Sequence, residues 1–253
     1  IQPSEFFKIA VILYVSDYMA KRYRVKKFKN DLLFPAFLTM LGFGLILLQP
    51  DFGSGIVMVC SIVVIVLAAD SPIKYFVRIG MLGAAGLGGL ILSAPYRLAR
   101  ITSFINPWED PLGAGFQIIQ SLFAIAPGGI LGVGFDQSMQ KHFYLPEPQT
   151  DFIFAIFAEE FGFIGCVLLI TLFLLVIYEG VKIALHCHDV YLCYVAIGLT
   201  SLFAIQVMIN LGVVVGLFPV TGITLPFISY GGSSLLVMMG SMGLLMSIAN
   251  HSA

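Results

Sequence analysis

Residues 144–156 read YLPEPQTDFIFAI, and within this stretch a polar, proline-rich loop turns into a long apolar helix. The apolar run that begins here continues to residue 179, which exceeds the roughly 20 residues that a helix needs to cross a bilayer. Asp151 stands at the junction between the loop and the helix. A carboxylate at a membrane surface is a candidate for chemistry on a membrane-bound substrate.

The whole chain has the composition of a membrane protein. Of its 253 residues, 59% are hydrophobic and only 11% are charged, whereas soluble domains carry about 25% charged residues. The apolar residues occur in long runs, which predicts an all-α fold, a polytopic helical membrane protein. The four cysteines lie mostly inside these runs, so we expect buried thiols and no disulfide framework.

About seven spans are predicted, and together they form one transmembrane domain over residues 1–253. A long extracytoplasmic loop, about residues 95–151, separates the fourth span from the fifth. The predicted spans are Glu5–Met19, Leu32–Leu48, Phe52–Ala69, Tyr75–Ala94, Asp151–Glu179, Val190–Val215 and Gly231–Asn250.

A cluster of basic residues between the first two spans sets the predicted orientation. Its members are Lys21, Arg22, Arg24, Lys26, Lys27 and Lys29. The positive-inside rule places this cluster in the cytoplasm, so it serves topology and anionic lipid, and we expect no nucleic acid partner. Alternation then places the start of the chain outside, which predicts that further spans precede Ile1.

Two charged residues share one face of the first span. Glu5 and Lys8 are spaced i, i+3, and an ionisable group inside a span is costly. One interpretation is a mutually neutralising pair in which Lys8 extends its amine to the interface. The other is a polar wall of a substrate cavity. Asp51, in the next outer turn, either caps the following helix or faces inward towards this pair.

The long outer loop carries a second pair at i, i+3, Arg97 and Arg100. A diphosphate is a natural ligand for two arginines so spaced, although an interfacial pair that meets lipid headgroups has the same pattern. Asp151 also has two interpretations, because aspartate before an apolar run is a common helix cap. Glu159 and Glu160 lie two turns further on and need a partner or a cavity.

A glycine-rich apolar segment, Gly113–Phe135, lies in the same loop. No lysine follows it as in a phosphate-binding loop, so it predicts a short amphipathic or re-entrant segment at the outer membrane surface.

Residues 186–189 read HCHD but sit in a short cytoplasmic loop. A structural zinc site needs four spaced ligands, so no metal site is predicted.

Four motifs resemble those of a known family, the SEDS proteins (shape, elongation, division and sporulation). They are QPSEFFK at 2–8, QPDFG at 49–53, the segment 146–162, and PVTGITLPFISYGGSS at 219–234, in family order. The form PEPQTD, together with NPW at 106–108, is more similar to the division and sporulation branch than to the elongation branch. Family members have ten spans, and this chain resembles the part from the fourth span onward.

The resemblance implies a peptidoglycan glycosyltransferase that polymerises lipid II at the outer face of the bacterial cytoplasmic membrane, in cell division or sporulation. Asp151 matches the essential outer-face aspartate of the family, and Glu5, Lys8 and Asp51 match polar residues of its central cavity. The implied partners are a class B penicillin-binding transpeptidase and other division or sporulation membrane proteins.

In the implied reaction, Asp151 is the expected base that takes a proton from the acceptor hydroxyl. Lys8, Arg97, Arg100 or a divalent cation are candidates to stabilise the leaving diphosphate. Two alternatives remain from the residues alone. A lipid II flippase would use the buried charges along a translocation path, and a scaffold would only position the transpeptidase.

Overall fold

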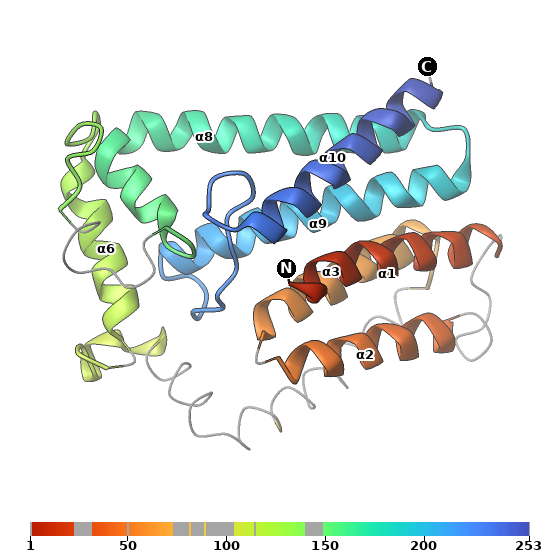
Figure 1. The fold of residues 1–253 in the computed structure, drawn as a ribbon, viewed down its shortest axis with the longest axis horizontal. Coiled ribbons are helices and arrows are strands. Elements are labelled where there is room, and N and C mark those ends of the chain that lie inside the picture. Colours follow the sequence, from red (N-terminus) through yellow and green to blue (C-terminus); the bar gives the residue numbers. More distant parts are fainter. Residues whose placement is uncertain are drawn as a thin grey trace. The chain divides into compact units, whose positions relative to one another are not determined.

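The computed structural model describes residues 2–22, 32–49, 51–72, 81, 89, 104–113, 115–139 and 149–252. Every regular element among these residues is a helix (Figure 1). The predicted all-α class is therefore confirmed. Apart from residues 81 and 89, the predicted span Tyr75–Ala94 lies outside the described residues, as do Arg97, Arg100 and the loop residues 140–148.

The helix boundaries follow the apolar runs closely at most ends. The elements are α1 (Pro3–Ala20), α2 (Leu33–Leu47), α3 (Phe52–Ala68), the 3₁₀ helix η2 (Pro107–Glu109), α6 (Phe116–Gly128), α8 (Ile153–His186), α9 (Val190–Val214) and α10 (Gly232–Ser252). The predicted end of the fifth span, Glu179, is wrong by two turns. An exposed i, i+3 ion pair between Lys182 and Glu179, 3.4 Å long, sits where the helix continues beyond the apolar run.

Three of the described helices are long and apolar enough to cross a membrane, namely α8, α9 and α10. The apolar helices α2 and α3 have 15 and 17 residues. At 1.5 Å per residue they extend roughly 22 and 26 Å, somewhat less than a hydrocarbon core of about 30 Å. Large apolar side chains of α8 such as Phe163, Leu168 and Leu174 are exposed, as lipid contact requires. The chain is a multi-pass membrane protein.

The chain divides into two compact units. The first unit comprises Ile1–Met81, Leu174–Gln206 and Gly231–Ala253, and the second comprises Leu82–Phe173 and Val207–Tyr230. Helices α8 and α9 each contribute residues to both units. The single domain over residues 1–253 stays a prediction.

In the first unit, α1 is the central helix of the core. It packs against α2, α3 and α10. A Cβ atom on Gly198 of α9 would lie 2.6 Å from Ile12 of α1 and 2.7 Å from Ile65 of α3. Small residues allow such close approach, which is how helices associate inside a bilayer. Ile12, Ile65 and Leu199 are fully buried at this contact.

In the second unit, α6 packs against η2 and against the end of α9. The rings of Trp108 in η2 and Phe123 in α6 are 6.0 Å apart, edge to face. The hydroxyl of Ser121 is fully buried and donates a 2.7 Å hydrogen bond to the carbonyl oxygen of Val214. The predicted outer segment Gly113–Phe135 thus contains a helix of 13 residues, too short to span the membrane.

Helix α8 is broken at Gly162, where the chain changes direction (Figure 1). Gly162 has φ of 65° and ψ of −163°, a conformation that is essentially restricted to glycine. A Cβ atom there would also collide with backbone atoms of residues 128–132. The sequence analysis missed this break, because glycine is common in membrane helices and most such glycines serve packing.

Residues 128–134, the end of the glycine-rich segment, lie against the break in α8 and form hydrogen bonds with its backbone. A helix break inside a membrane protein leaves backbone donors and acceptors that need partners from elsewhere. Four hydrogen bonds of 2.9 to 3.2 Å provide them. They run from Val133 N–H to Glu159 O, Gly134 N–H to Glu160 O, Phe163 N–H to Gly129 O and Ile164 N–H to Ile130 O.

Candidate functional site

The first group of predicted site residues lies in the first unit, on the first turns of α1. Lys8 Nζ donates a 2.7 Å hydrogen bond to Glu5 Oε1, and the side chains are 1% and 5% exposed. The i, i+3 spacing on a helix brings the two groups together, as the sequence predicts. The neutralising pair is therefore confirmed, and its charges offset each other where burial would otherwise be costly.

The same interpretation also had Lys8 extend its amine to the membrane interface, and this part of it is wrong. Its side chain is almost fully enclosed, because α1 is the central helix of its unit and other helices cover this face. The other carboxylate oxygen of Glu5, Oε2, is also buried and has no hydrogen-bond partner among the described residues. An acceptor of this kind favours a hydrogen-bond donor that arrives from outside the described residues.

Asp51 lies at the start of α3 and is held by two donors. Its Oδ1 accepts from the Ser54 N–H at 3.0 Å, so Asp51 caps α3 as one interpretation predicted. Its Oδ2 accepts from Gln2 Nε2 at 2.9 Å, which links Asp51 to the residue before α1. The Gln2 N–H in turn donates to Ser233 Oγ near the start of α10. Asp51 thus joins a polar group at the starts of three helices, and within the described residues no ion pair connects it to Lys8.

Asp151 lies in the second unit, in the turn that precedes α8. The helix begins at Ile153, and the Asp151 side chain is half-buried. A Cβ atom on Gly222, in the loop between α9 and α10, would lie 3.6 Å from Asp151 Oδ2. Gly222 has φ of 73°, a backbone conformation that favours glycine at this position.

Two further side chains reach this turn, and the sequence analysis did not select either. Asn210 Nδ2 in α9 donates to the carbonyl oxygen of Asp151 at 2.9 Å. Ser229 Oγ donates to the carbonyl oxygen of Thr150 at 2.6 Å. The available signal for Asn210 was a carboxamide within an apolar run, which in a membrane helix indicates a polar contact with another segment.

Glu159, predicted to need a partner or a cavity, has partners just after the glycine-rich segment, at residues 138 and 139. Ser138 Oγ donates to its Oε2 at 2.5 Å, and the Met139 N–H donates to its Oε1 at 3.1 Å. The side chain is 2% exposed. Both carboxylate oxygens are thus satisfied, and Glu159 anchors residues 138 and 139 to α8.

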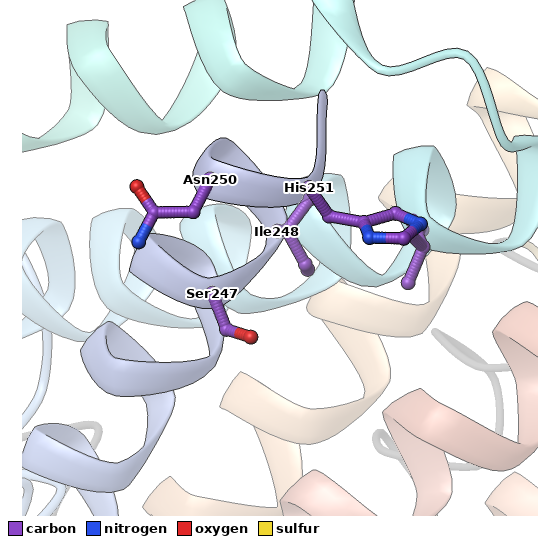
Figure 2. Close-up of a pocket in the computed structure, with 5 residues that line it drawn as sticks. Ser247, Ile248, Asn250 and His251 are labelled. Carbon is purple, nitrogen blue, oxygen red and sulfur yellow. The ribbon is translucent and has the colours of Figure 1, made fainter. Parts of the chain in front are cut away.

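A separate pocket of about 450 Å³ lies in the first unit at the end of α10 (Figure 2). It is lined by Leu192, Ser247, Ile248, Asn250 and His251. None of the predicted site residues is among them. Among the described residues, no cluster of three or more histidine, cysteine, aspartate or glutamate side chains is arranged to hold a metal ion.

Comparison with known proteins relates the chain to one family along its whole length. The family model FTSW_RODA_SPOVE, described as cell cycle protein, matches residues 1–253. Stage V sporulation protein E of Bacillus subtilis (strain 168) is 52% identical over 253 residues, which are 100% of this chain and 69% of that protein. A probable peptidoglycan glycosyltransferase FtsW of Geobacter sp. (strain M18) is 40% identical over 252 residues, 99% of this chain and 68% of that protein.

A solved structure shares the fold as well. It is a chain from a study of how a peptidoglycan synthase complex coordinates polymerisation and crosslinking. It has a TM-score of 0.80 and 33% sequence identity, and the match covers 100% of this chain and 70% of that chain. The family resemblance noted in the sequence is thereby confirmed: this chain belongs to the FtsW/RodA/SpoVE family of cell cycle proteins.

Proposed function

We propose that this chain is a peptidoglycan glycosyltransferase that polymerises lipid II into glycan strands at the outer face of the cytoplasmic membrane. Its membership of the FtsW/RodA/SpoVE family over all 253 residues supports this function. So do the names of two similar proteins, a probable peptidoglycan glycosyltransferase and a stage V sporulation protein. The process that it serves is cell division or sporulation.

The observation that carries the proposal is the placement of Asp151. Asp151 is half-buried where a loop enters a membrane-spanning helix, and Gly222 lies beside its carboxylate. A general base needs a fixed position and access to the hydroxyl that it deprotonates. A carboxylate at the end of a span also lies at the depth of the lipid headgroups, where the sugars of a lipid-linked substrate lie.

The proposed reaction is a glycosyl transfer. The 4-hydroxyl of the acceptor sugar attacks the anomeric carbon of the lipid-linked donor, and a new glycosidic bond forms. The bond between that carbon and the diphosphate oxygen breaks, and the lipid diphosphate leaves with the electron pair. Asp151 takes the proton of the attacking hydroxyl, so charge and atoms balance.

The buried pair on α1 supports a role in substrate binding more than in leaving-group stabilisation. Because Lys8 is bonded to Glu5 at 2.7 Å, its positive charge is already offset. Arg97 and Arg100 stay the stronger candidates for the diphosphate. Within the described residues Glu5 Oε2 keeps an unused acceptor that suits a hydroxyl or amide donor of the substrate. The hydrogen bond from Gln2 Nε2 to Asp51 Oδ2 links the start of α3 to the residue before α1.

A class B penicillin-binding transpeptidase is the proposed partner, together with other membrane proteins of division or sporulation. Support comes from the similar chain in a peptidoglycan synthase complex, in which polymerisation and crosslinking are coordinated. A polymerase releases strands that a transpeptidase must crosslink, so physical coupling of the two fits the chemistry.

The test is polymerisation of fluorescent lipid II by the purified full-length protein. Asp151→Asn keeps the size of the side chain and removes the base, so we expect a loss of about 10²- to 10⁴-fold in rate. Asp17→Asn is the matched control, because Asp17 is an exposed carboxylate paired with Lys21 on α1. Wild-type rates from Asp151→Asn would reject the base assignment.

A second candidate function, a lipid II flippase, is favoured by one observation, the buried pair of Glu5 and Lys8 in a membrane helix. Detergent-solubilised protein separates the two functions. No transbilayer movement occurs in a micelle, so polymer formation there requires a polymerase. A protein that moves lipid II in vesicles and forms no polymer in detergent would favour the flippase.

A further inference from the structure

Three consecutive carbonyl groups before α8 each accept a hydrogen bond from a different donor. The carbonyl of Gln149 accepts from the Tyr230 N–H at 2.8 Å. That of Thr150 accepts from Ser229 Oγ at 2.6 Å, and that of Asp151 accepts from Asn210 Nδ2 at 2.9 Å. The backbone around the proposed base is therefore bonded residue by residue to other segments of the second unit.

Asn210 is the most constrained of these donors. Its side chain is 1% exposed, and Nδ2 also donates to the carbonyl oxygen of Ile223 at 2.7 Å. The oxygen Oδ1 has no hydrogen-bond partner among the described residues. Both N–H bonds of the carboxamide are thus used on two carbonyls.

These two bonds join the base to the loop segment beside it. Ile223 directly follows Gly222, the residue beside the Asp151 carboxylate. One carboxamide therefore fixes both the backbone of Asp151 and the loop that faces its side chain. A shift of either element would break a hydrogen bond of the buried Asn210 carboxamide and leave one of its donors unsatisfied, which is costly away from water.

Ser229 completes the same arrangement from the other end of the loop. Its Oγ accepts from the Leu225 N–H at 2.7 Å while it donates to Thr150. The hydroxyl thus closes the turn 225–229 and attaches it to the residue before Asp151. Asn210 and Ser229 come from different segments, α9 and the loop, and act on adjacent carbonyls.

We infer that Asn210 and Ser229 are positioning residues for Asp151, which hold its carboxylate at the loop–helix junction for the transfer reaction. This inference rests on the proposed function, since it assigns a purpose to the same site. A misplacement of about 1 Å can reduce an enzymatic rate by roughly 100-fold. We call the hydrogen bonds from Asn210 and Ser229 to the carbonyls of Asp151 and Thr150 the tether. The tether acts on geometry, so its loss lowers kcat and leaves the KM for lipid II little changed.

The experiment compares four variants of the full-length protein in detergent. Asn210→Leu removes both donations and keeps the branched shape and the number of side-chain heavy atoms, and Ser229→Ala removes one hydroxyl at a half-buried position. Ser121→Ala is the matched control, because its buried hydroxyl also donates to a carbonyl of the second unit, that of Val214, away from the turn. Ser229→Thr keeps a hydroxyl and should restore most of the activity.

Two readouts are needed. Hydrogen–deuterium exchange at residues 149–156 should become roughly fivefold faster or more in Asn210→Leu and Ser229→Ala, and should stay unchanged in Ser121→Ala. In the polymerisation assay, kcat should fall about 10- to 100-fold in these two variants, with KM within about twofold of wild type. If Asn210→Leu does not fold, the Ser229 pair of variants decides alone.

Unchanged exchange at residues 149–156 would overturn the tether, and faster exchange with wild-type kcat would overturn its catalytic purpose. If Ser121→Ala lost as much activity as Asn210→Leu and Ser229→Ala, the cause would be a general effect of buried hydrogen bonds, and this too would overturn the inference. A wild-type protein that makes no polymer would instead refute the proposed function, and with it the purpose of the tether, whereas the exchange data would still establish the contact itself.

Discussion

Lys8 Nζ lies 2.7 Å from Glu5 Oε1 within α1, and both side chains are almost fully buried. The charges of the two groups offset each other in a helix that packs against three further helices. Removal of one partner alone leaves an uncompensated buried charge, which is the costly case for buried ion pairs.

We therefore expect Lys8→Met to lower the free energy of unfolding by about 3–5 kcal/mol. The double variant Glu5→Leu/Lys8→Met should lose less than either single variant, because no charge is then left unpaired. The midpoint of thermal unfolding in detergent measures both effects. Lys21→Met serves as control, since its pair with Asp17 is exposed and should matter little. Equal shifts in Lys8→Met and Lys21→Met would contradict the expectation.

The break in α8 leads to a second prediction. Gly162→Ala should destabilise the protein by about 1–3 kcal/mol or more, because φ is 65° and a Cβ atom would collide with the backbone of residues 128–132. Gly240→Ala in α10 is the control, since open space surrounds its Cβ position and alanine favours a helix. The midpoint of thermal unfolding should therefore fall in Gly162→Ala, and it should rise or stay unchanged in Gly240→Ala. A tolerated Gly162→Ala would mean that α8 can be straightened without cost.

The Glu159 carboxylate anchors residues 138 and 139, just after the glycine-rich segment, and this gives a third prediction. Glu159→Leu removes the acceptor of both Ser138 and the Met139 N–H. We expect protease cleavage near residues 135–139 to become markedly faster, because this segment has lost its attachment to α8. Glu179→Leu, at an exposed position of the same helix, should leave the cleavage rate unchanged. A cleavage rate unaffected by Glu159→Leu would show that the backbone bonds alone hold the segment.

Asp51 allows its capping role to be separated from a functional role. Asp51→Asn keeps an oxygen that can accept from the Ser54 N–H, whereas Asp51→Ala removes the cap and should cost about 1 kcal/mol of stability. If the negative charge takes part in substrate binding, Asp51→Asn should retain stability and lose polymerisation activity. Full activity in Asp51→Asn would restrict Asp51 to the cap. Thermal unfolding and the lipid II assay, measured on the same preparations, distinguish these outcomes.

Much of the fold could be predicted because apolar runs of span length allow few structures other than a helix in a bilayer. The start of α3 at Phe52 and of α9 at Val190 agrees with the prediction, and Asp51 gives a local capping signal for the former. The end of α8 was misplaced, since a polar turn such as Glu179–Lys182 does not itself stop a helix. The break at Gly162 was missed because a single glycine in a span indicates packing as readily as a kink.

The candidate site likewise has contacts that the sequence predicts and contacts that only the structure shows. The contact of Glu5 with Lys8 spans less than one helical turn, so sequence spacing alone predicts it. The motifs likewise single out Asp51 and Asp151, whose roles in the reaction stay predictions. Asn210 lies 59 residues from Asp151 in the chain, and Ser229 lies 79 residues from Thr150. No local pattern relates such distant positions.

The sequence by itself determined the helical membrane class, most helix boundaries, the position of each charge and the family, because these depend on local composition and on motifs along the chain. Only the tertiary structure decided that Lys8 is enclosed, that a glycine-rich segment fills the break in α8, and that Asn210 and Ser229 hold the backbone at Asp151. These outcomes depend on which segments meet in space. Inside a membrane protein, buried donors and acceptors depend on those segments for their partners, because the hydrocarbon core holds no water to provide them.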